Sequence, residues 1–111
     1  MKSILAILIM ASGLTINIHA MNLNNQATCG MIFSMVSIIN REQGNLRMMK
    51  KHKQKMLDMI NNMRDYGYDD DTITKAIATN MPNALKIMKS AEYDEFGYKK
   101  YVNRCLDELE K

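Results

Sequence analysis

Tryptophan is absent from this sequence, proline occurs only once, at Pro82, and neither sign of charge dominates. The chain also lacks long β-branched runs and shows no alternation of apolar and polar residues with a period of two. Because a half-buried strand needs that alternation, the pattern argues against a β-sheet protein. The formal net charge of +3 is too small to indicate nucleic acid as the partner.

Side-chain combinations that perform catalysis are also missing. His52 has no carboxylate three or four residues away to orient it, and Ser34, Ser37 and Ser90 belong to no nucleophile–base motif. The acidic run Asp69–Asp71 lacks the alternating ligand spacing and the final Glu of a calcium-binding loop. We therefore expect a protein that is not an enzyme and that needs no cofactor.

The first twenty residues have the organisation of a secretory signal peptide. Lys2 supplies a positive charge, Ile4–Met10 is apolar, and Ala11–Ala20 is more polar and ends in a small residue. Since a membrane-spanning helix needs about 20 apolar residues, the short run favours cleavage after Ala20 over a stable membrane anchor. We expect the mature protein in the periplasm or outside the cell, with no stable membrane insertion after cleavage.

The only two cysteines, Cys29 and Cys105, both follow the expected cleavage site. In an oxidising compartment a lone pair of cysteines is most simply a disulfide. The closed loop would contain nearly the whole mature chain, and chain-entropy reasoning gives such closure about 4–5 kcal/mol. For a domain this small, the bond would supply much of the net stability.

Capping residues and helical spacing divide the first half of the mature chain. Residues 21–28 are polar and Asn-rich, so we expect a flexible lead-in, with Thr28 as the N-cap of a first helix. Gly44 ends that helix, and Asn45 caps a second helix that extends to about Tyr66. The apolar side chains that recur at three- and four-residue spacing are Cys29, Ile32, Phe33, Val36, Ile39, Met49, Met56, Ile60 and Met63.

Capping residues also mark the helix boundaries in the second half of the chain. One residue of Asp69–Asp71 is expected to cap a third helix, and Asp94 to cap the last one. Pro82 either starts a fourth helix or lies within a single kinked helix. The fold expected for residues 29–111 is one all-α domain, a compact array of four or five short helices. The disulfide would join the first and last helices, since each cysteine falls on the apolar stripe of its helix.

Two exposed features are candidates for contact with another protein. The second helix begins with a dense cationic segment, in which Lys50, Lys51 and Lys53 would steer a partner with an acidic surface. Tyr93 and Phe96, close to the start of the last helix, would supply contact area, because aromatic side chains are enriched in interfaces. The alternatives are a solvated cationic face and aromatic residues that belong to the core.

The twelve methionines suggest a different function. Met48, His52 and Met56 are four residues apart and would line one face of the second helix. Thioether and imidazole ligands suit Cu(I) and Ag(I), so the alternative function is a periplasmic carrier of a soft metal ion. Against it, methionine also fills cores flexibly, and the surrounding lysines repel a cation.

Two stretches resemble known types of exported protein. Cys29–Gly44, with Ile39 and Arg41 near the end of the first helix, resembles a recurrent small periplasmic protein of bacteria and phages. In that type a second cysteine lies in the final helix, as Cys105 does here. The ending Tyr101–Asp107 resembles the last helix of immunity proteins for type VI secretion amidases, which are helical, exported and disulfide-bonded. The resemblance implies an inhibitor or immunity factor that binds an envelope-acting enzyme.

Overall fold

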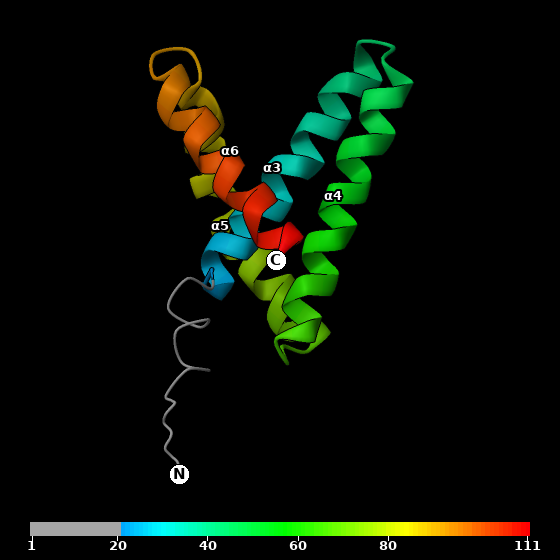
Figure 1. The fold of residues 1–111 in the computed structure, drawn as a ribbon, viewed down its shortest axis with the longest axis vertical. Coiled ribbons are helices and arrows are strands. Elements are labelled where there is room, and N and C mark those ends of the chain that lie inside the picture. Colours follow the sequence, from blue (N-terminus) through cyan, green and yellow to red (C-terminus); the bar gives the residue numbers. More distant parts are fainter. Residues whose placement is uncertain (1–20) are drawn as a thin grey trace.

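The computed structural model describes residues 21–111, and they form four α-helices (Figure 1). These are α3 (Leu23–Glu42), α4 (Leu46–Asp65), α5 (Asp70–Ser90) and α6 (Glu95–Glu110). The range 21–111 contains no strand, so the expected all-α fold is confirmed. Within the same range, no helix combines the length and the apolar character needed to cross a bilayer. The signal peptide expected over residues 1–20 lies outside the described residues.

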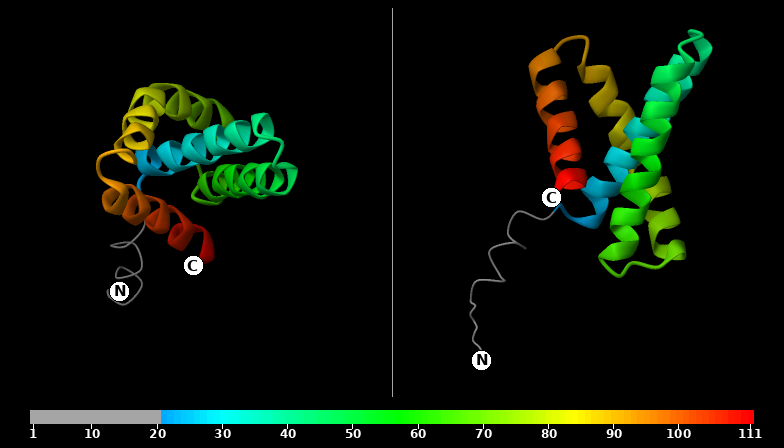
Figure 2. Two further views of the ribbon diagram at one scale, coloured as in Figure 1. Left: turned by 90° about the horizontal axis from the view of Figure 1, so that it is seen from above. Right: turned by 45° about the vertical axis from the view of Figure 1, so that its right-hand side comes forward.

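The four helices form two hairpins that diverge like the arms of a V (Figure 1). One arm consists of the second half of α3 and the first half of α4, with residues 43–45 at its tip. The other arm consists of the end of α5 and the start of α6, with residues 91–94 at its tip (Figure 2). α3 packs closely against both α4 and α5, whereas α6 has few contacts with any other helix.

The helix boundaries follow the local signals of the sequence. Asn45, Asp69 and Asp94 are the N-caps of α4, α5 and α6, and each side chain accepts a hydrogen bond from the backbone nitrogen three residues later. Gly44 and Gly67 have φ angles of +79° and +100°, which residues with a side chain rarely adopt. These expected N-caps and the expected stop at Gly44 are confirmed, and Gly67 ends α4 in the same way.

The beginning of the first helix differs from the expectation. α3 starts at Leu23, and the side chain of its N-cap, Asn22, accepts a hydrogen bond of 2.8 Å from the backbone nitrogen of Asn25. The prediction that residues 21–28 are a flexible lead-in is therefore wrong, as is Thr28 as the N-cap. The helix starts six residues before Cys29, which consequently lies inside α3.

Polar residues of this first segment are buried because other helices supply their hydrogen bonds. Gln26 and Thr28 are fully buried. Asn62 of α4 donates to Oε1 of Gln26 at 2.8 Å, and Asn83 of α5 donates to the Thr28 hydroxyl at 3.3 Å. The prediction failed because it took polar composition to mean exposure. A polar side chain can be buried when a residue distant in the chain forms a hydrogen bond with it.

Pro82 neither ends nor starts a helix. α5 continues through it from Asp70 to Ser90, so a single helix, one of the two expected alternatives, is correct at this position. A proline inside a helix costs about 3 kcal/mol through the lost hydrogen bond and the ring clash. Burial of Ile73, Ala76 and Ala84 against the rest of the fold offsets that cost.

The disulfide lies in the core at the crossing of the helices. Cys29 and Cys105 are bonded, with 5.7 Å between their Cα atoms, and both are at most 1% exposed. The predicted connection of the first and last helices is confirmed. The buried core cluster consists of Met21, Ala27, Cys29, Phe33, Met59, Met63, Ile73, Ala76 and Cys105.

We expect the double substitution Cys29→Ser, Cys105→Ser to lower the free energy of unfolding by about 2–5 kcal/mol. The bond closes a long loop and holds the sparsely packed α6, so the amides of α6 should also lose protection from hydrogen exchange first. Urea unfolding and exchange measurements test this, with chemically reduced wild type as the control. A loss below about 1 kcal/mol would show that noncovalent packing alone holds α6.

Candidate functional site

An open apolar hollow of about 380 Å³ lies between the diverging arms, where α3 and α5 separate. Ile38, Ile39 and Leu85 line it and are 44%, 46% and 44% exposed. Ile39 was expected in the core stripe, and its exposure results from the divergence of the arms. Clusters of exposed aliphatic side chains mark interaction sites more often than single ones do. The full lining is Met35, Ile38, Ile39, Leu85, Met88, Lys89 and Glu92.

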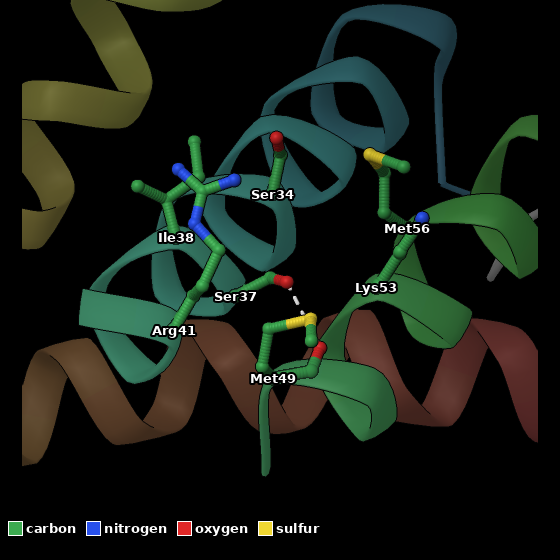
Figure 3. Close-up of a pocket in the computed structure, with 7 residues that line it drawn as sticks. All are labelled: Ser34, Ser37, Ile38, Arg41, Met49, Lys53 and Met56. Atoms are coloured by element: carbon green, nitrogen blue, oxygen red, sulfur yellow. Dashed lines mark hydrogen bonds between the residues drawn. The ribbon is translucent and has the colours of Figure 1, made fainter. Parts of the chain in front are cut away.

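A second hollow of about 200 Å³ lies on the other side of the same stretch of α3, facing α4 (Figure 3). Ser37 donates a hydrogen bond of 2.9 Å to the backbone oxygen of Met49, which ties the two helices together at its base. Arg41 of α3 and Lys53 of α4 lie on opposite sides of the hollow (Figure 3). Its lining consists of Ser34, Ser37, Ile38, Arg41, Met49, Lys53 and Met56.

Ile38 belongs to both hollows and joins them into one surface. We call the two linings together the inter-arm surface, after the larger hollow; the second hollow lies within the arm formed by α3 and α4. Its charged side chains are Arg41, Lys53 and Lys89 against a single acid, Glu92. The ion pairs found within residues 21–111 involve other side chains. The inter-arm surface is therefore apolar in its middle and mainly cationic around it.

The residues predicted to bind a partner do not form one patch. Lys53 lines the inter-arm surface, while Lys50 and Lys51 are exposed on α4 outside both hollows. Tyr93 and Phe96 are 76% and 80% exposed at the connection of α5 and α6, so they belong to the other arm. The cationic and the aromatic groups thus lie on different arms of the V, although both are exposed as expected.

Phe96 also lines a third hollow of about 500 Å³, whose walls come from α6 alone. Because no second helix closes it, this hollow is a surface depression along one helix. Its other lining residues are Lys99, Lys100, Asn103, Arg104 and Asp107.

The soft-metal alternative concerns Met48, His52 and Met56 on α4. The Nδ1 atom of His52 lies 2.9 Å from the backbone oxygen of Met48, so this nitrogen is assigned as the donor and Nε2 is the atom left for a ligand. The His52 ring also lies 6.5 Å from the Phe33 ring, and Met56 lines the second hollow. Among residues 21–111, no three His, Cys, Asp or Glu side chains are grouped to hold a metal ion. Metal binding by the thioethers stays a prediction.

A buried carboxylate, Glu108 of α6, was not anticipated from the sequence. It is 4% exposed and accepts hydrogen bonds from Asn62 at 2.9 Å, the Tyr66 hydroxyl at 2.8 Å and the Met21 nitrogen at 3.0 Å. Lys111 Nζ lies 2.9 Å from it. Burial raises the pKa of the Glu108 carboxyl, but these hydrogen bonds lower it by more, so its pKa lies below the usual value.

The sequence contains weak indications of two features that it did not lead us to predict, the buried Glu108 and the exposed apolar hollow. Glu108 lies three residues after Cys105, so helical spacing places it beside the core stripe of α6. Ile38 directly precedes Ile39, and adjacent residues cannot both face the core from one stripe. Neither indication identifies the groups that bind Glu108 or predicts that Ile38 stays exposed, because both depend on the positions of other helices.

No protein-family model, curated protein or solved structure matches this chain. The resemblance to periplasmic two-cysteine proteins and amidase immunity proteins therefore stays a prediction. Function has to be inferred from the geometry of the molecule itself.

We expect Glu108→Gln to flatten the dependence of stability on acidic pH. A carboxyl whose pKa is lowered by folding stabilises the protein above its unfolded pKa of about 4.3, and this stabilisation is lost as the pH falls through the folded value. Urea unfolding between pH 7 and pH 2 should show a smaller loss for the variant than for wild type. Glu110→Gln, an exposed neighbour, is the matched control and should follow the wild-type curve. Parallel curves for all three proteins would contradict the assignment.

Proposed function

We propose that this protein is an exported, non-enzymatic domain that binds another protein, acting as an inhibitor or immunity factor for an envelope-acting enzyme. The observation that carries the proposal is the inter-arm surface. Ile38, Ile39 and Leu85 remain exposed together on two helices, and covering them would remove apolar area from water.

The occupant that fits this surface is a helix or loop of a partner with apolar side chains and acidic flanks. An apolar middle with charged residues around it is the usual arrangement of a protein interface. Arg41 and Lys53 on one side and Lys89 on the other would face acidic groups of the partner. An amphipathic segment in a groove between two helices is a common form of such recognition.

The residues singled out from the sequence take supporting roles in this proposal. Lys50, Lys51 and Lys53 add to the positive potential along α4 and would accelerate the approach of an acidic partner. Tyr93 and Phe96, at the tip of the other arm, would contact a partner large enough to span both arms.

Ile38→Asp should weaken partner binding by about thirtyfold, because it places a charge in the apolar middle of the contact. Leu57→Asp is the matched control, since Leu57 is 41% exposed on α4 and lines none of the hollows. Each variant is immobilised and exposed to envelope extract, and the captured partner is then purified and titrated. The proposal is supported if wild type and Leu57→Asp capture the same stoichiometric partner and Ile38→Asp does not. Equal capture by both variants would contradict the proposed surface.

Reversing the charge of Lys50 and Lys51, which lie outside the hollows, to Glu should slow association by about tenfold at low salt and leave dissociation nearly unchanged. The reason is that exposed charges act mainly on the diffusional approach. The control reverses Lys75 and Lys86, which are exposed on α5 outside the hollows and change the net charge equally. Stopped-flow or surface-binding kinetics with the purified partner measure both rates. Equal slowing by the two sets, or a difference that persists in high salt, would argue against a steering role for α4.

A further inference from the structure

The backbone nitrogen of Met21 is held by a carboxylate that comes from the far end of the chain. It donates a hydrogen bond of 3.0 Å to Oε1 of Glu108, 87 positions away, and both residues are buried. The end of α6 and the start of α3 lie close together in Figure 1 and in the right-hand view of Figure 2. This contact therefore joins the first and last described helices close to the disulfide.

Met21 is fixed at three points, as a bound ligand would be. Its nitrogen contacts Glu108, its carbonyl oxygen accepts a hydrogen bond of 2.9 Å from Gln26 Nε2, and its sulfur lies 3.5 Å from Sγ of Cys29. The two carboxylate oxygens of Glu108 bind different groups. Oε2 takes Asn62, Tyr66 and Lys111, whereas the hydrogen bond to Oε1 comes from Met21.

Met21 is also the residue that would come first after cleavage following Ala20, the position expected from the sequence. Hydrolysis of the peptide bond between Ala20 and Met21 consumes one water and turns the Ala20 carbonyl into a carboxylate. The Met21 amide nitrogen, with one proton and no charge, becomes an ammonium with three protons and a full positive charge. We propose that Glu108 is a binding site for the new α-ammonium of Met21, and that this buried ion pair completes the docking of α6 after export. The proposal depends on the cleavage position and is independent of the proposed partner binding.

The electrostatics at the start of α3 favour this pair. A helix N-terminus carries a partial positive charge, which acidic residues of the first turn usually offset. α3 has no acidic residue in its first turn. An ammonium at this position would add a further positive charge, and the carboxylate that compensates both is Glu108 of α6. Hydrogen bonds from Asn62 and Tyr66 hold that carboxylate in place.

Pairing with a buried carboxylate raises the pKa of an α-amine above its usual value of about 8. The stabilisation is then present below that value and is lost as the pH rises through the folded pKa. The other titratable groups facing Glu108 are Lys111, at the end of α6, and Tyr66, which follows α4. Because both groups are themselves ionisable, the test needs a comparison protein that keeps them and moves only the α-amine.

The comparison protein carries Gly-Ser inserted between Ala20 and Met21, which places the α-amine two residues away from Glu108. Both full chains are exported, and the mass of each mature protein identifies its first residue. We expect urea unfolding at pH 7 to give the extended protein a folding constant about tenfold lower. Glu108→Gln should abolish most of this difference, and the matched variant Glu110→Gln should keep it.

A second measurement needs no substitution at Glu108, and therefore holds even if Glu108→Gln fails to fold. Between pH 8 and pH 10 the native mature protein should lose stability more steeply than the extended one. Three results would each overturn the proposal: a mature protein that begins at a residue other than Met21, equal stability with parallel pH curves, or a difference that persists in Glu108→Gln. Loss of partner capture in Ile38→Asp has no bearing on any of them.

Discussion

α6 contacts the other helices over little surface, and its position depends on two buried links to the start of α3, besides a partly buried hydrogen bond of 3.2 Å from the Tyr101 hydroxyl to Asn25. The first is the bond between Cys29 and Cys105, and the second is the buried carboxylate of Glu108 with its donors. Both links lie in the C-terminal half of α6. The N-terminal half of α6 and the end of α5 are therefore free to project away from α3, and this produces the V of Figure 1.

The same constraint explains why apolar side chains stay exposed. In a helical bundle the helices pack along their whole length and bury such apolar side chains. A helix packed in this way against α3 would cover Ile38 and Leu85. With α6 held at one end only, the hollow between α3 and α5 stays open. Exposed clusters of aliphatic groups add nothing to folding, which is why this surface supports the proposed binding of a partner.

In the proposed scheme, export connects the two links chemically. The disulfide forms in an oxidising compartment, and a free ammonium at Met21 would exist only after a leader is removed. Met21 touches both, since its sulfur lies beside Cys29 and its nitrogen beside Glu108. In this scheme the domain becomes fully stable only in the compartment where it acts, because a reduced and unprocessed chain lacks the disulfide and the ion pair between Glu108 and a free Met21 ammonium.

The sequence by itself determined the helical class, most helix boundaries and the disulfide. Asn45, Asp69 and Asp94 cap their helices through neighbours three residues away, and two cysteines allow one pairing. These features are local or combinatorial, so no knowledge of the tertiary structure is required to infer them.

Tertiary structure decided which polar residues are buried and which apolar residues are exposed. Gln26 and Glu108 are buried because Asn62 supplies hydrogen bonds to both, and Ile38 is exposed because the arms diverge. The candidate lysines and aromatic residues were correctly expected at the surface, but their separation onto two arms depends on where α6 is attached. Burial and adjacency are properties of pairs of residues distant in the chain, and a periodic pattern within one helix carries no information about them.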